Sequence, residues 1–131
     1  MPEIDSELEL ALNYLDHNKD ESLKRLFDIL KIPSISTQEK YSKDCLNAAN
    51  WFVEQLQDIG FYASIRETNG HPMVVAHFEQ EGPHFLFYGH YDVQPIDPIE
   101  LWNHDPFKPK IEKSHNGEII KARGASDDKG Q

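Results

Sequence analysis

Cysteine is almost absent from this sequence. The chain holds a single cysteine, Cys45, so it cannot form an internal disulfide. The disulfide frameworks of small secreted domains are therefore excluded. Cys45 lies within a helical pattern of apolar residues, which favours a buried packing role over a nucleophilic one. We expect a reducing, cytoplasmic setting for the protein.

Positive charge is also scarce. The 131 residues include 23 acidic and 13 basic side chains, which gives a net charge of -10. Proteins bind nucleic acids and anionic membrane surfaces through clustered positive charge. The composition therefore predicts that neither a nucleic acid nor a membrane is a partner.

Long hydrophobic runs are missing as well. The longest apolar stretch falls far short of the ~18 residues expected of a membrane-spanning helix. The first ten residues, MPEIDSELEL, are acidic and lack the basic start and apolar run of a targeting segment. We expect no transmembrane helix, no secretory signal and no organellar transit peptide.

The first part of the chain shows the 3.6-residue period of amphipathic helices in three segments. The apolar positions are Leu8, Leu12 and Leu15 in the first segment, Leu23, Leu26, Phe27 and Leu30 in the second, and Cys45, Ala49, Phe52, Val53 and Leu56 in the third. Asp20 is the expected N-cap of the second helix, and Pro33 should stop it. Ser36 and Glu39 have the spacing of a capping box, and Gly60 suits a helix C-terminus.

After residue 60 the period changes to that of strands. Residues 61–66 alternate apolar and polar side chains, and Asn69-Gly70 predicts a turn into a second strand at 72–78. Residues 84–89 are almost continuously apolar, which predicts a central strand covered on both faces. An ordered loop and a further hairpin turning at Asn116-Gly117 follow. The predicted class is α/β, with N-terminal helices followed by part of a mixed β-sheet.

His90 and Asp92 stand at the end of the predicted central strand, in the stretch FLFYGHYDVQP. A spacing of two places both side chains on the same face of extended backbone. A neutral imidazole is a good zinc ligand, and a neighbouring carboxylate can bind its second nitrogen and fix its orientation. Open α/β sheets place their sites at the carboxyl ends of strands. On its own, however, a His-x-Asp pair is a weak signal.

Two adjacent aspartates, Asp127 and Asp128, lie in the last segment, RGASDDKGQ. The small residues before Asp127 allow close approach of the backbone to an ion or ligand. A divalent cation makes crowded carboxylates tolerable. The alternative interpretation is a solvated acidic turn in which Lys129 is a local counter-charge.

Taken together, the two stretches resemble one known family. YGHYDVQP, followed 37 positions after His90 by the first aspartate of RGASDDKGQ, is similar to the co-catalytic zinc peptidase superfamily. Carnosinase-like dipeptidases, aminoacylases, succinyl-diaminopimelate desuccinylase, acetylornithine deacetylase and glutamate carboxypeptidase belong to it. The stretches HYDVQP, LWNHDPFKP and the double aspartate before Lys-Gly look most like the dipeptidase and carnosinase branch. The resemblance covers essentially the whole chain, including IPSIS in the early part.

This resemblance implies a role for each residue of the two motifs. His90 resembles a ligand of one zinc, Asp92 the carboxylate that orients His90 during catalysis, and Asp127 the carboxylate that bridges two zincs. It also implies a cis peptide bond between Asp127 and Asp128, and structural roles for Asp128 and Lys129. The remaining histidines match no ligand position and are expected at the surface or in packing: His17, His71, His77, His84, His104 and His115.

The resemblance further implies a protein larger than residues 1–131. Family chains carry, past this motif, a general base, further metal ligands and an inserted domain for dimerisation or substrate closure. Residues 1–131 are therefore expected to be the N-terminal part of a catalytic domain, from a parent that forms a homodimer, and to be inactive alone. The complete enzyme would hydrolyse the amide bond of dipeptides or N-acyl amino acids with a water activated by two zincs. Cobalt or manganese would also suit these ligands.

Two other classes of protein are alternatives to this enzyme. A metallo-β-lactamase type of hydrolase also uses a His-x-Asp element, but it needs a His-x-His-x-Asp-His cluster that residues 89–92 do not supply. The other class is a non-enzymatic or degenerate α/β domain of the same superfamily. The intact His90 and Asp127 count against degeneration.

Overall fold

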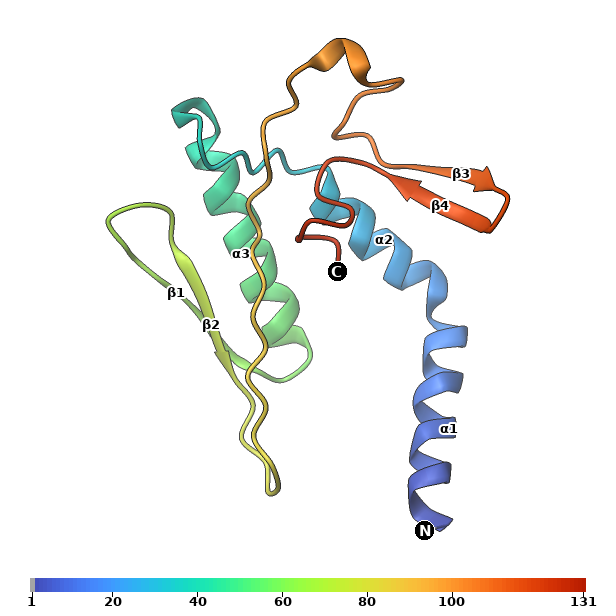
Figure 1. The fold of residues 1–131 in the computed structure, drawn as a ribbon. Coiled ribbons are helices and arrows are strands. Elements are labelled where there is room, and N and C mark those ends of the chain that lie inside the picture. Colours follow the sequence, from blue (N-terminus) through green and yellow to red (C-terminus); the bar gives the residue numbers. More distant parts are fainter. Residues whose placement is uncertain (1) are drawn as a thin grey trace.

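Helices occupy the first part of the chain and two β-hairpins the second, in a computed structural model that describes residues 2–131 (Figure 1). The helices are α1 (Pro2–His17), α2 (Lys19–Leu30) and α3 (Ser42–Asp58), with short 3-10 turns η1 (Glu39–Tyr41) and η2 (Ile99–Leu101). The strands are β1 (Tyr62–Arg66), β2 (Met73–His77), β3 (Lys110–Ser114) and β4 (Gly117–Lys121). The predicted α/β class, with helices preceding strands, is confirmed.

The first two helices form where the apolar period predicts them. In α1, however, Leu8, Leu12 and Leu15 leave 51–58% of their surfaces exposed, and the helix projects away from the other elements in Figure 1. The prediction that Asp20 caps α2 is wrong. The helix already begins at Lys19, and the residue before it, Asn18, makes no side-chain cap bond.

The predicted capping box at the start of the third helix is also wrong. Gln38 precedes η1 without a side-chain cap bond, and the hydroxyl of Ser36 donates instead to the distant carboxylate of Asp92. A charged acceptor is a stronger partner than a backbone group, because charge-assisted hydrogen bonds are roughly twice as strong as neutral ones. The end of the helix is as expected, since Gly60 adopts a φ of +96° just after α3.

A small core surrounds the loop between α2 and α3. Its buried apolar side chains are Ile29, Leu30, Ile35, Cys45, Ala48, Ala49, Ala63 and Val93. Cys45 is fully buried with a free thiol, so the predicted packing role is confirmed. Burial and the charges of Asp92 and Asp44 raise the pKa of this thiol, which keeps it protonated. The core therefore joins the end of α2, the following loop, α3 and the segment around Val93.

The strands form two separate antiparallel pairs instead of one mixed sheet. In the first pair, β1 and β2 place Ser64 opposite Val75, and α3 packs against both strands. In the second, β3 and β4 place Ser114 opposite Gly117. Both predicted hairpins are confirmed. The prediction of one mixed sheet is wrong for the described residues, because the two pairs are not hydrogen-bonded to each other.

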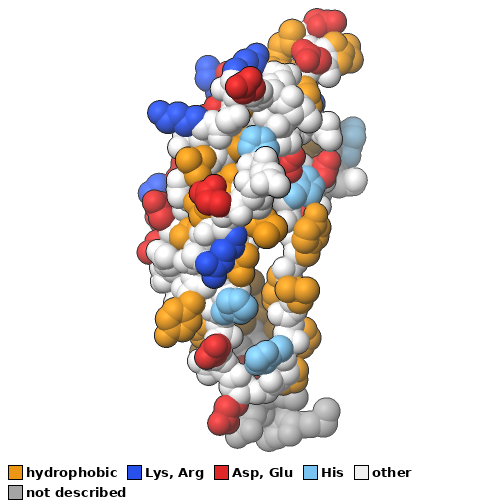
Figure 2. Space-filling view, turned by 90° about the vertical axis from the view of Figure 1, so that its left-hand side faces the viewer, with side chains coloured by type: hydrophobic (Ala, Val, Ile, Leu, Met, Phe, Trp, Pro, Cys, Tyr) orange, Lys and Arg blue, Asp and Glu red, His pale blue; other side chains and the backbone are white. Residues whose placement is uncertain are grey.

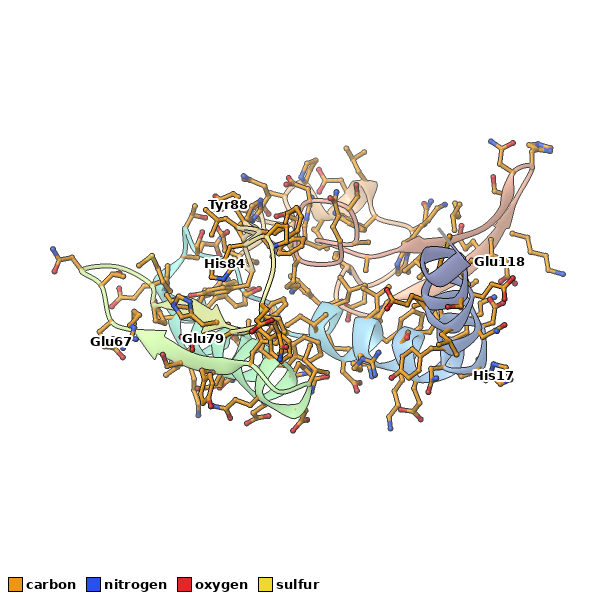
Figure 3. All side chains as sticks on the ribbon, turned by 90° about the horizontal axis from the view of Figure 1, so that it is seen from below. His17, Glu67, Glu79, His84, Tyr88 and Glu118 are labelled. Carbon is orange, nitrogen blue, oxygen red and sulfur yellow. The ribbon has the colours of Figure 1, made fainter. Side chains whose placement is uncertain are left out.

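Residues 85–88 differ most from expectation. The predicted central strand is an extended stretch outside any sheet, and Phe85, Leu86, Phe87 and Tyr88 are 79–96% exposed. Figure 1 draws this stretch between β2 and η2 without a strand arrow, and Figure 3 labels Tyr88 at its end and His84 just before it. The side chains have the period and composition of a buried strand. Strand formation also needs a partner, which the described residues do not provide here.

The loop after β1 lies far from α1 and from the hairpin of β3 and β4. Seen from below in Figure 3, Glu67 lies near one end, whereas His17 of α1 and Glu118 of β4 lie near the other. Figure 2 shows hydrophobic side chains scattered among acidic, basic and histidine side chains on the face that it draws. No helix within residues 2–131 has the length and apolar character needed to cross a bilayer.

The terminal turn is closely packed around two glycines. Gly124 has a φ of +82°, and a Cβ on it would lie 2.6 Å from Cγ1 of Val93. The N–H of Gly130 donates to the carbonyl of Gly124 at 2.9 Å. A Cβ on Gly130 would lie 2.5 Å from the carbonyl oxygen of Ala125. The turn that carries Asp127 and Asp128 therefore has no room for a side chain at either glycine.

We expect Gly130→Ala to lower the free energy of unfolding by about 1–3 kcal/mol, the usual cost of forcing extra atoms into a packed site. The backbone of Ala125 must move to accept the methyl group. Urea denaturation followed by circular dichroism measures the change. Gly70→Ala is the control, because a Cβ there meets only Oγ1 of Thr68, at 3.9 Å. Equal stability of the two variants would contradict the packing of the turn.

We expect the 131-residue chain to self-associate through residues 85–88, because an exposed apolar segment with free backbone groups favours pairing with a second copy. Light scattering across a range of concentrations should show a mass that rises with concentration. Phe85→Lys combined with Phe87→Lys should reduce that mass, whereas Gln80→Lys on the neighbouring loop should not. A monomer at all concentrations, or suppression only by Leu12→Lys in α1, would exclude this segment as the contact.

Candidate metal centre

His90 and Asp92 lie on the extended segment that follows residues 85–88. The segment is fixed just beyond them, where the N–H of Val93 donates to the carbonyl of Ser34 at 2.9 Å and Ile35 and Val93 form an isolated parallel bridge. His90 and Asp92 each leave 40% of their side chains exposed. The predicted pair is therefore at the surface, next to the small core.

The imidazole of His90 lies between two carboxylates. Its Nδ1 is 3.1 Å from Oδ1 of Asp92 and also 3.1 Å from the carbonyl oxygen of Asp92. Its Nε2 is 3.2 Å from Oδ1 of Asp127. Oxygens of this kind only accept hydrogen bonds, so the Asp92 side of the ring favours a proton on Nδ1. In the neutral ring, the lone pair of Nε2 then faces Asp127.

Opposing effects act on the protonation of His90. Burial by itself lowers its pKa. The hydrogen bond to the carbonyl of Asp92 and the charge of the Asp92 carboxylate raise it, and the charges of Asp128 and Asp127 add to this. The net result is a pKa above the ordinary value of 6.5. Negative charge around the ring favours a cation at this position, whether a proton or a metal ion.

Asp128 holds the two parts of the site together. Its Oδ2 accepts the backbone N–H of His90 at 3.0 Å, and the peptide bond between Asp127 and Asp128 is cis, as the resemblance implies. Gly89 allows this approach, because a Cβ there would lie 3.0 Å from Oδ2 of Asp128. The two neighbouring aspartates thus face the same histidine through different atoms.

Lys129 is buried, with 4% of its surface exposed. Its Nζ donates to the carbonyl of Ile32 at 2.7 Å and to the hydroxyl of Ser34 at 3.2 Å. Burial lowers the pKa of Lys129 to about 8. The alternative of a solvated turn with Lys129 as a surface counter-charge is therefore wrong, because the ammonium group points into the protein and bonds to neutral oxygens.

The loop from Ile32 to Ser36 contacts both segments that carry the candidate ligands, which the sequence did not indicate. The hydroxyl of Ser34 donates to the carbonyl of Tyr91 at 2.6 Å, and that of Ser36 to Oδ2 of Asp92. Both partners are more than fifty residues away along the chain. Periodicity and capping patterns report only on near neighbours, so they could not identify these serines.

Hollows of similar size border two different parts of the described chain. One, of about 360 Å³, borders Asp127 and is lined by Gln94, Trp102 and Arg123 among others. The guanidinium carbon of Arg123 lies 4.9 Å from the ring centre of Trp102. The other, of about 390 Å³, lies beside β1 and β2 and has none of the candidate ligands in its lining. The first hollow is therefore the one relevant to the site.

The donor atoms of His90 and Asp127 fit a divalent cation. Two ligand atoms about 2.1 Å from one zinc in tetrahedral geometry lie roughly 3.4 Å apart, which is close to the 3.2 Å between Nε2 and Oδ1. Within the described part of the chain, no group of three or more histidine, cysteine, aspartate or glutamate residues is arranged to hold a metal ion. By themselves, these two residues could therefore supply only part of the ligands that a metal ion needs.

The other histidines lie outside this arrangement. Nδ1 of His17 is 2.6 Å from the carbonyl of Asn13, and Nε2 of His104 is 3.2 Å from that of Lys121. Nε2 of His71 is 2.8 Å from the carbonyl of Ser36. His71 therefore contacts the loop that supports Asp92, although it does not contact His90.

Comparison with known proteins identifies the family. The model of "Peptidase family M20/M25/M40" matches residues 86–131, which include His90, Asp92 and Asp127. The Cys-Gly metallodipeptidase DUG1 of Candida albicans is 29% identical over 94% of this chain and 28% of its own length.

Two solved structures share the fold. The di-peptidase Dug1p of Saccharomyces cerevisiae has a TM-score of 0.74 and 29% identity, over 88% of this chain and 27% of its own. Human carnosine dipeptidase 1 has a TM-score of 0.77 and 25% identity, over 94% of this chain and 28% of its own. This chain thus spans little more than a quarter of each of these relatives. It belongs to the M20 metallopeptidase superfamily and corresponds to the N-terminal part of that superfamily's proteins.

Proposed function

We propose that these residues belong to a metal-dependent hydrolase that cleaves the amide bond of dipeptides or small N-acyl amino acids. The observation that carries the proposal is the placement of His90, with Nδ1 beside Asp92 and Nε2 3.2 Å from Oδ1 of Asp127. The relatives named as a Cys-Gly metallodipeptidase and a carnosine dipeptidase support the substrate class. Zinc is the proposed metal, and cobalt or manganese would suit the same donor atoms.

Each residue would have a distinct part in holding the metal. His90 would be a ligand of one ion, and Asp127 would be a ligand shared by two ions. Asp92 would orient the imidazole, since it contacts the nitrogen that faces away from Asp127. A bound divalent cation supplies an acidified water and polarises the carbonyl to be cleaved. The hollow beside Asp127 is where a small substrate could approach these residues.

We also propose that residues 1–131 form the N-terminal part of a catalytic domain. A catalytic zinc usually has three protein ligands and a water, and the described residues supply only the His90 and Asp127 pair. The remaining ligands, the general base and a domain that forms the homodimer would then come from other parts of the full-length protein.

Replacing the two aspartates should have different effects on metal content in the full-length protein. Asp92→Asn should keep two metal ions per chain at saturating zinc but reduce the rate or the metal affinity about 10–100-fold, as is usual for a residue that orients a ligand. Asp127→Ala should lose metal and activity together, because both ions depend on its carboxylate. Elemental analysis beside dipeptide hydrolysis measures both quantities.

The matched control for these variants is Asp58→Asn, an exposed aspartate at the end of α3. It should change neither metal content nor rate. If Asp92→Asn lost a full equivalent of zinc at saturation, or Asp127→Ala kept two, the assigned roles would be wrong.

The 131-residue chain alone should not hydrolyse dipeptides or N-acyl amino acids, because it supplies only part of the ligand set and lacks the proposed general base. An assay of purified chain with added zinc, cobalt or manganese against a panel of dipeptides tests this. Turnover that survives repurification and disappears on His90→Ala would contradict the expectation.

A further inference from the structure

The carboxylate of Asp92 uses its two oxygens for two different partners. Oδ1 lies 3.1 Å from Nδ1 of His90, and Oδ2 accepts a hydrogen bond from the hydroxyl of Ser36. The torsion that turns an aspartate carboxylate has broad, shallow minima. One hydrogen bond therefore leaves the plane of the carboxylate poorly defined, whereas a second bond at the other oxygen fixes it. The orientation of Asp92 toward His90 thus depends on Ser36.

The backbone of Ser36 is held in place by a contact of its own carbonyl and by the packing of the preceding residue. Nε2 of His71 can donate to the carbonyl of Ser36 at 2.8 Å. The preceding residue, Ile35, is 1% exposed and forms the parallel bridge with Val93, directly after Asp92. The hydroxyl is therefore presented to Asp92 from a rigid piece of backbone. Ser36 therefore contacts Asp92, and Asp92 in turn contacts His90, the histidine proposed to bind the metal.

We propose that Ser36 is a positioning residue for the metal centre, which acts on His90 through Asp92 and raises the affinity for a divalent cation. The proposal rests on the proposed function, in which His90 and Asp127 hold the metal. Ser36 is half-buried and does not belong to the small apolar core. Loss of its hydroxyl should therefore affect metal binding more than folding.

The first experiment compares Ser36→Ala with Ser36→Thr in the full-length protein. Zinc affinity is measured by competition with a chromogenic chelator, and the ligand field by the visible absorption of bound Co²⁺. Ser36→Ala should bind zinc about 3–10-fold more weakly, below the 10–100-fold typical of a direct partner of a ligand. Ser36→Thr keeps the hydroxyl and should stay within about twofold of the parent, with the same cobalt spectrum.

A double-mutant cycle shows whether Ser36 acts through Asp92. In an Asp92→Asn background, Ser36→Ala should change zinc affinity little further. Asp92 can then no longer transmit the effect of Ser36 to His90, and the effects of two coupled residues on affinity do not add. Ser64→Ala, a half-buried serine of β1 away from the site, is the matched control. It should leave both affinity and cobalt spectrum unchanged.

The outcomes separate this inference from the proposed function. If the parent binds zinc through His90 and Asp127 but Ser36→Ala binds it equally well, the inference is wrong and the proposed function stands. The inference is also wrong if Ser36→Thr is as weak as Ser36→Ala, or if the effects of Ser36→Ala and Asp92→Asn add fully. If His90→Ala and Asp127→Ala leave zinc binding unchanged in the parent, the proposed function fails and the inference fails with it.

Discussion

The arrangement of the site depends on the hydrogen bonds of one buried hydroxyl, that of Ser34. This hydroxyl donates to the carbonyl of Tyr91, between His90 and Asp92, and accepts from the ammonium group of Lys129. Its partners lie 57 and 95 residues away along the chain. Because a serine hydroxyl can donate and accept at the same time, this side chain ties the segment of His90 and the segment of Asp127 to the loop after α2.

The burial of Lys129, which this link requires, is unfavourable in free energy. An ammonium group removed from water is destabilised unless it finds hydrogen-bond acceptors, and burial lowers the pKa of Lys129 to about 8. The carbonyl of Ile32 and the hydroxyl of Ser34 offset part of this cost. The turn that carries Asp127 is thereby anchored from within the protein, while Asp127 itself stays 78% exposed at the surface.

Electrostatics gives the site its preference for a cation. Three aspartates surround one histidine. Burial lowers the pKa of His90, but the hydrogen bond to the carbonyl of Asp92 and the charges of the three carboxylates keep it above its ordinary value. The hydroxyl of Ser36 donates to the carboxylate of Asp92, and the backbone N–H of His90 donates to that of Asp128, so hydrogen bonds stabilise both negative charges. The carboxylate of Asp127, in contrast, faces Nε2 of the imidazole, the nitrogen proposed to bind metal. A divalent cation between these two groups would satisfy both, which supports the proposed function.

Local sequence alone determined the helices, the two hairpins and the pairing of His90 with Asp92, because these features depend on the period of the side chains and on neighbours a few residues apart. The meeting of His90 with Asp127 was implied only by family resemblance, since no local rule brings together residues 37 positions apart. Tertiary structure alone decided that Ser34, Ser36 and Lys129 support the site, because their partners come from distant segments. It also decided that residues 85–88 stay outside a sheet, since the composition of a strand cannot replace a neighbouring strand to pair with.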